Sequence, residues 1–238
     1  MNIKVLHLYH NIMNLYGDYG NVVILKKHLE DQGNTVTIDK KTIGEEYNPN
    51  NYNFVYIGAG TERNLDRVLK DLFIHKDEFK KYIDDKKYIL ATGNSFEMFG
   101  KKIEEQEGLN IFEFEVKRDK DRSTSDIIYE SEYLKNDVVG FVNKSTKIYH
   151  NMNPFFKVKF GLGENEKQDY EGVKYKNFYG THISGPILAR NPEFLQSLVI
   201  GLCKDLSRDF KPKKIVYENE QKGYELVLEE LTKRAESK

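Results

Sequence analysis

The segment Leu90-Ala91-Thr92-Gly93-Asn94-Ser95-Phe96-Glu97-Met98-Phe99-Gly100 has the pattern of a buried strand that turns sharply into a helix. A turn of this type needs small side chains two residues before and two residues after its apex. With Gly93 at the apex, these places hold Ala91 and Ser95, which are both small. With Ser95 at the apex, they hold Gly93 and the bulky Glu97. The steric pattern therefore predicts that Gly93 is the apex residue.

The first half of the chain alternates apolar runs with amphipathic helical patterns. Such alternation predicts an α/β fold with a mostly parallel sheet flanked by helices on both faces, whose ligands bind at the carboxyl ends of the strands. We expect Asp18 to cap the first helix and Thr61 to cap the second. The expected strands are residues 3–8, 35–38, 54–57 and 88–91, and the expected helices are 19–32, 61–72 and 77–84.

The second half changes to short alternating strands and predicts an antiparallel or mixed sheet. Asn191-Pro192 indicates a helix start, with Asn191 as the cap of a helix that ends near residue 206. A charged amphipathic pattern over 219–234 predicts a last helix. We interpret residues 1–210 as a single domain and residues 211–238 as a C-terminal helical extension. The strands expected in this half are 111–116, 125–130, 138–142, 155–160 and 173–178.

Composition excludes several classes of partner and site. The 37 basic and 38 acidic residues nearly cancel, so no general field favours nucleic acid or an anionic membrane. No apolar run approaches the length of a membrane-spanning helix, and residues 1–4 show no targeting segment, so we expect a cytoplasmic protein without membrane insertion. The single cysteine, Cys203, is expected to be a buried structural thiol. His7 and His10 are expected on opposite faces of a strand, and we predict no metal and no cofactor.

Four further segments carry a family resemblance. They are Tyr9-His10, Asn14-Leu15-Tyr16-Gly17-Asp18-Tyr19-Gly20-Asn21, Gly58-Ala59-Gly60 and Gly180-Thr181-His182-Ile183-Ser184-Gly185-Pro186. With the segment around Gly93 they resemble, in collinear order, a class I glutamine amidotransferase of the cobyric acid synthase (CobB/CobQ) and GatD type. The resemblance is closest to GatD, the glutaminase subunit of lipid II isoglutaminyl synthase. It implies the flavodoxin-like fold of that family.

The resemblance also implies site residues. The family's nucleophilic cysteine matches Gly93, and its catalytic base histidine matches Ser184. Glycine has no nucleophile and a serine hydroxyl is far too weak a base near neutral pH, so hydrolysis by the family mechanism is expected to be absent. Gly58, Ala59, Gly60 and Asn94 match the oxyanion pocket, whose backbone N–H groups would face the apex. Arg122 and Glu97 match substrate-binding positions.

The expected function is therefore that of a pseudoenzyme in peptidoglycan biosynthesis. It would act as a non-catalytic subunit of a Mur-ligase-like or other ATP-dependent synthetase, or as a binding protein for glutamine or a related small molecule. Two alternatives remain open. One is an active amidotransferase subunit that supplies ammonia for lipid II or cobyric acid amidation. The other is a serine hydrolase that pairs Ser95 with His182.

Overall fold

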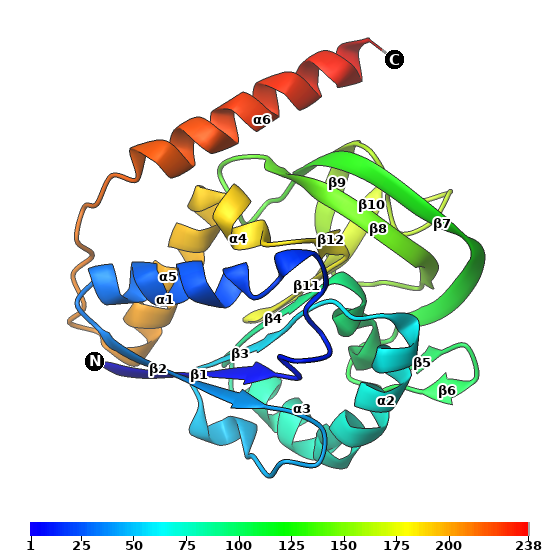
Figure 1. The fold of residues 1–238 in the computed structure, drawn as a ribbon, viewed down its shortest axis with the longest axis horizontal. Helices are drawn as coiled ribbons and strands as arrows, with labels where there is room; N and C mark the ends of the chain where they lie inside the picture. The colour runs from blue at the N-terminus through cyan, green and yellow to red at the C-terminus, as the bar shows by residue number, and fades with distance from the viewer. Residues whose placement is uncertain (238) are drawn as a thin grey trace.

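The strands join into one mixed sheet in the computed structural model, which describes residues 1–237 (Figure 1). Its order is β12-β8-β7-β9-β10-β11-β4-β3-β1-β2. Strands β2, β1, β3, β4 and β11 run parallel, and the strands from β11 through β10, β9, β7, β8 and β12 pair antiparallel. The predicted change from a parallel to a mixed sheet is confirmed. The strands are β1 Asn2–Leu8, β2 Thr35–Lys41, β3 Phe54–Ile57, β4 Tyr88–Thr92, β5 Lys102–Ile103, β6 Gln106–Glu107, β7 Glu115–Glu130, β8 Val138–Tyr149, β9 Pro154–Phe160, β10 Tyr170–Tyr175, β11 Phe178–Thr181 and β12 Ile183–Ser184.

Helices cover both faces of the parallel part (Figure 1). Alternate residues of a strand point to opposite faces; in β1, Val5 packs with α1, α4 and α5, whereas Leu6 packs with α2, α3 and η4. The alternation of apolar residues thus fills two cores at once. The helices are η1 Leu15–Gly17, α1 Gly20–Asp31, η2 Pro49–Asn51, α2 Glu62–Leu72, η3 Phe73–His75, α3 Lys76–Asp84, η4 Gly93–Phe99, α4 Ile187–Arg190, α5 Pro192–Leu206 and α6 Glu218–Glu236.

The carboxyl ends of β1, β3 and β4 lie at one level of the sheet. Leu8 is in register with Ile57, and Ile57 is in register with Ala91. The loops that follow these strands therefore meet at one edge, where open parallel sheets bind ligands. The order β2-β1-β3-β4 is the flavodoxin-like one expected from the resemblance.

The hairpin of β7 and β8 is longer than the sequence pattern indicated, and the strand predicted over 111–116 begins only at Glu115. The backbone N–H groups of Ile111 and Phe112 donate to the carbonyl of Phe99, at 3.1 and 3.0 Å. These residues are therefore tied to the end of η4 and have no partner strand. Their apolar side chains pack against the core, which explains why their pattern resembles that of a strand.

One of the three predicted caps forms as expected. The Thr61 side chain accepts a hydrogen bond from the N–H of Asn64 at 3.2 Å and caps α2. The prediction for Asp18 is wrong, because its carboxylate is buried and accepts from Ala59 and Thr92 instead.

Asn191 does stand before Pro192 at the start of α5, but its side chain does not cap the helix. The Asn191 carboxamide bonds to the backbone N–H and C=O of Val139, at 2.8 and 2.9 Å. It joins α5 to β8. A tertiary contact has replaced the local capping contact in this case, as it has for Asp18.

The C-terminal segment packs against the rest of the chain through apolar and polar contacts. Tyr224 and Leu231 of α6 bury against Ile128 and Val139 on the outer face of β7 and β8. His28 of α1 is 3.0 Å from a carboxylate oxygen of Glu220. Figure 1 shows α6 lying across one end of the molecule. The division at residue 210 stays a prediction.

Candidate functional site

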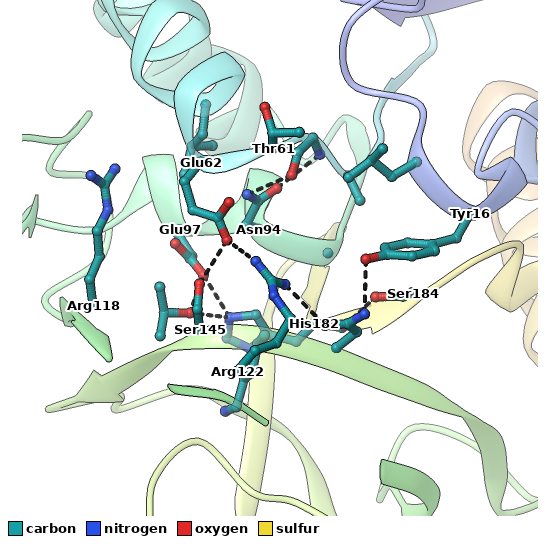
Figure 2. Close-up of a pocket in the computed structure, with 18 residues that line it drawn as sticks. Tyr16, Thr61, Glu62, Asn94, Glu97, Arg118, Arg122, Ser145, His182 and Ser184 are labelled. Atoms are coloured by element: carbon teal, nitrogen blue, oxygen red, sulfur yellow. Dashed lines mark hydrogen bonds and ion pairs between the residues drawn. The ribbon is translucent and has the colours of Figure 1, made fainter. Parts of the chain in front are cut away.

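A cavity of about 170 Å³ lies at the carboxyl ends of the parallel strands (Figure 2). Its walls come from the loop after β1, the loop between β3 and α2, the start of η4, strands β7 and β8, and the junction of β11 and β12. Gly93, Asn94, Glu97, His182 and Ser184 all line it. The tertiary structure therefore brings together residues that the sequence separates by up to about ninety positions.

Gly93 occupies the turn between β4 and η4 with a φ of +61°. This left-handed conformation disfavours residues with a β-carbon and suits glycine. A second restriction comes from the neighbouring loop: an ideal Cβ on Gly93 would lie only 2.4 Å from the Cβ of Ala59. Ala59 thus fills the space that any side chain at position 93 would need first.

Asp18 anchors the loop after β3. Its Oδ2 accepts hydrogen bonds from the N–H of Ala59 at 2.6 Å and from the hydroxyl of Thr92 at 3.0 Å. The carboxyl group is fully buried, and this burial raises its pKa to about 7 against the opposing effect of the hydrogen bonds. Asp18 therefore ties the loop after β1 to the ends of β3 and β4.

Asn94 holds the next residue of the same loop. Its Oδ1 accepts from the N–H of Gly60 at 3.0 Å, and its Nδ2 donates to the carbonyl of Gly60 at 2.9 Å. The N–H groups of Ala59 and Gly60, which were expected to serve as oxyanion donors, are therefore both engaged inside the protein. Gly58 is packed tightly as well, since a Cβ there would lie 2.5 Å from the carbonyl oxygen of Met13.

Ser184 and Ser95 lie in different surroundings. Ser184 lines the cavity, and its hydroxyl donates to the carbonyl of His182 at 3.3 Å. The Ser95 hydroxyl is fully buried and is 2.9 Å and 2.8 Å from the carbonyls of Ile57 and Thr92. Within residues 1–237, Ser95 makes no hydrogen bond to His182, so the structure does not form the serine–histidine pair that was weighed as an alternative.

His182 lies between two carboxylates, and all three side chains are about 1% exposed. Its Nε2 donates to Oε1 of Glu97 at 2.8 Å. Its Nδ1 lies 3.3 Å from Oε1 of Glu171, without hydrogen-bond geometry. Both ring nitrogens therefore face carboxylate oxygens of the protein. This arrangement suits a role in holding the site together.

Glu97 is held by the same contacts. Besides His182, its Oε1 accepts from the hydroxyl of Thr146 at 2.6 Å, while its Oε2 is buried without a partner. Glu171 accepts from the hydroxyl of Thr181 at 2.7 Å and from the N–H of His182 at 2.6 Å. The elbow turn, defined as residues 92–97, is thus fixed to the end of β11 through a buried network of hydrogen bonds centred on His182.

Glu171, Thr146 and Lys144 were not among the site residues predicted from sequence. Lys144 is buried beneath the cavity, where its Nζ donates to the carbonyls of Gly163 and Glu164 at 2.6 and 3.0 Å. Burial lowers the pKa of Lys144, although nearby carboxylates oppose the shift. The period of two along β8 could have revealed it, because Lys144 and Thr146 continue the buried positions of Val142.

Comparisons with known proteins agree with this architecture. Residues 4–192 match the model of the CobB/CobQ-like glutamine amidotransferase domain. The chain belongs to this family. It is 29% identical over 241 residues to the lipid II isoglutaminyl synthase (glutamine-hydrolyzing) subunit GatD of Staphylococcus aureus strain N315, covering 99% of each chain. It is 30% identical over 210 residues to the GatD subunit of Streptococcus pneumoniae strain R6, covering 85% of this chain and 81% of that one.

Solved structures show the same fold. A glutamine amidotransferase structure aligns with a TM-score of 0.56 at 17% identity, covering 83% of this chain and 97% of the other. A glutamine amidotransferase from Thermotoga maritima aligns with a TM-score of 0.51 at 11% identity, covering 98% of this chain and 97% of that one. The predicted class I amidotransferase-like fold and the resemblance to GatD are therefore confirmed.

Charged side chains surround the mouth of the cavity in this amidotransferase-like chain (Figure 2). Arg122 forms an ion pair with Glu62, and its Nη1 donates to Oδ1 of Asn143 at 3.0 Å. Nδ2 of Asn143 in turn donates to the hydroxyl of Tyr16 at 2.9 Å. Arg118 pairs with Asp66 in the same way as Arg122 pairs with Glu62. Arg122, which was expected to bind substrate, thus stands at the mouth with a carboxylate of the protein already beside it.

The remaining candidate residues lie elsewhere. His7 and His10 do not lie on opposite faces of a strand: the chain turns at Tyr9, which has a φ of +54°, and brings the two ring centroids within 6.0 Å. Burial lowers the pKa of His7 to about 4. Cys203 is buried in α5. Across residues 1–237, no group of three or more histidine, cysteine or acidic side chains is arranged to hold a metal ion. In the same range, no helix combines the length and apolar character needed to cross a bilayer.

Proposed function

We propose that this protein is the non-hydrolysing, glutamine amidotransferase-like subunit of an ATP-dependent amide ligase. Gly93 and Ser184 occupy the nucleophile and base positions of the family in this proposal. Its partner ligase is Mur-ligase-like and acts on a lipid II-type peptidoglycan precursor. The names of the two GatD relatives support this assignment, because both are subunits of a lipid II isoglutaminyl synthase.

One observation carries the loss of hydrolysis. The turn where the family places its nucleophile holds a glycine, and the Cβ of Ala59 closes the space that a nucleophilic side chain would occupy. Among the described residues that line the cavity there is no cysteine, and Ser184 offers a hydroxyl in place of a basic imidazole. At position 93, covalent catalysis on a glutamine carboxamide has no side-chain atom from which to begin.

The charged mouth supports a role in binding. The pairs Arg122–Glu62 and Arg118–Asp66 stand beside the opening and are between a third and a half exposed. Exposed pairs of this kind exchange partners at little cost. A ligand carboxylate or an acidic partner segment could therefore take either arginine without a large penalty. In this proposal the cavity keeps a binding role.

The proposal is tested by expressing the tagged chain in its native cell and identifying the proteins that copurify. We expect an ATP-dependent ligase to copurify, and the purified pair to amidate its acceptor with ammonium chloride but not with glutamine. The complex of the ligase with the Arg122→Ala variant serves as the control for binding at the mouth of the cavity. Release of glutamate and ammonia from glutamine by the wild-type protein would contradict the loss of hydrolysis. Absence of any ligase among the copurified proteins would contradict the subunit role.

A further inference from the structure

The Asn94 side chain lines the cavity beside the elbow turn and bonds to Gly60. Asn94 presents a carboxamide, the same group that ends a glutamine side chain. Its oxygen accepts from the N–H of Gly60 and its nitrogen donates to the carbonyl of Gly60. The two atoms cannot be exchanged, because Gly60 supplies one donor and one acceptor at fixed positions. Figure 2 shows this carboxamide pointing toward the loop that precedes α2.

The position of this contact gives it a functional meaning. Gly60 follows the carboxyl end of β3 and lies opposite the elbow turn, where a backbone N–H would stabilise an oxygen that gains negative charge. The other N–H group of the same loop, that of Ala59, is taken by Asp18 at 2.6 Å. A glycine at position 94 would have no side chain that could reach Gly60.

We propose that Asn94 is an internal ligand that keeps the carboxamide site of this cavity closed and so determines which molecules the cavity accepts. A molecule that presents a carboxamide to the elbow turn must first displace two hydrogen bonds. Ligands that use only the mouth, through Arg118 or Arg122, meet no such obstacle. This inference rests on the same assignment of the Gly93 turn as the proposed function.

The experiment follows the Gly60 amide by nuclear magnetic resonance in ¹⁵N-labelled wild-type protein, Asn94→Gly and Asn94→Asp. The probe is L-glutamine at millimolar concentration, with L-glutamate as the control for binding at the arginines. In the wild type we expect the Gly60 amide to be protected from hydrogen exchange and unmoved by glutamine. In Asn94→Gly we expect faster exchange, a saturable shift of Gly60 with glutamine, and an affinity at least about tenfold higher than in the wild type. Asn94→Asp keeps an acceptor for the Gly60 N–H but loses the donor to the Gly60 carbonyl, so its exchange rate and glutamine shift should lie between those of the wild type and Asn94→Gly.

Several results would overturn the proposal. One is a wild-type Gly60 amide that exchanges as fast as an unprotected peptide, which needs no substitution to observe. Another is a wild-type Gly60 amide that shifts with glutamine as strongly as that of Asn94→Gly. A third is an unmoved Gly60 amide in folded Asn94→Gly and in Asn94→Ala, whose methyl group cannot reach Gly60. Hydrolysis of glutamine by the wild type would instead contradict the proposed function, so the two failures are distinguishable.

Discussion

The β-carbon of Ala59 lies where the side chain of any residue other than glycine at position 93 would begin. Gly93 has a φ of +61°, and an added Cβ would lie 2.4 Å from the Ala59 Cβ and 3.1 Å from its Cα. Contacts under 3.0 Å do not persist between real side chains, so one of the two backbones would have to move. A methyl group on the loop after β3 and a side chain on the elbow turn therefore exclude each other.

This relationship predicts a large cost for Gly93→Ala. The substitution adds an overpacked contact, worth about 1–3 kcal/mol, to a left-handed conformation that costs a β-carbon about 1–2 kcal/mol. The free energy of unfolding, measured with urea, should fall by about 2–5 kcal/mol. Gly44→Ala is the matched control, because Gly44 has a φ of +79° and nothing within 4 Å of its added Cβ. It should show the conformational part alone.

The same contact predicts that Ala59→Gly partly rescues Gly93→Ala. Ala59→Gly removes the close approach that Gly93→Ala creates. A double-mutant cycle should therefore give a coupling free energy of about 1–3 kcal/mol. Additive effects of the two substitutions would show that the loop moves freely and that the contact has no energetic weight.

Under the proposed function, hydrolysis should need more than a cysteine at position 93 and a histidine at position 184. Gly93→Cys with Ser184→His is expected to release no detectable ammonia from glutamine, because Ala59 crowds the thiol and Asn94 occupies the Gly60 N–H. Adding Ala59→Gly and Asn94→Gly should make glutamate and ammonia appear together. Activity in the double variant alone would show that neither residue obstructs the site.

The buried network predicts a second effect on stability. Glu171→Gln replaces the buried carboxylate that accepts from the Thr181 hydroxyl and from the backbone N–H of His182 with a carboxamide, whose NH₂ group cannot accept. The free energy of unfolding should fall by about 1.5–3 kcal/mol. Glu166→Gln is the control, because Glu166 is 60% exposed and pairs with Lys147 at the surface. It should leave the urea midpoint unchanged.

Asp18 predicts how stability depends on pH. Its folded pKa is raised to about 7 from 3.8, so between these values the folded state holds a proton that the unfolded state has lost. Its contribution to stability is therefore present at low pH and disappears as pH rises toward 7, by up to about 1.4 kcal/mol per pH unit. Burial also raises the pKa of Glu164, to about 8, with the same sign, whereas His7, lowered to about 4, acts with the opposite sign only below about 6.5.

The test compares urea unfolding of the wild type and Asp18→Asn from pH 5 to pH 8. The wild type should lose stability steadily from pH 5 to about pH 7, and the Asn variant should lose less over this range, since an amide does not titrate. The difference between the two profiles isolates Asp18 from Glu164 and His7. Parallel profiles would mean that Asp18 is ionised throughout this range.

Much of the fold could be predicted from local patterns. Runs such as 54–57 are apolar at every position because both faces of a parallel strand are covered, and the Thr61 cap satisfies the helix start beside it. Predicted helix caps did not form where the side chain had a hydrogen-bond partner distant in sequence. Asp18 and Asn191 look like caps in sequence, but Ala59, Thr92 and Val139 offered hydrogen bonds in buried places, where leaving a group unpaired costs more.

The sequence by itself determined the alternation of strands and helices and, through its motifs, the family. These follow from residue types and their spacing along the chain. Only the tertiary structure decided that Ala59 fills the space above Gly93, that Asn94 bonds to Gly60, and that His182 lies between Glu97 and Glu171. Such contacts depend on the distances and directions of side chains from different strands, which the order of residues along one strand does not specify.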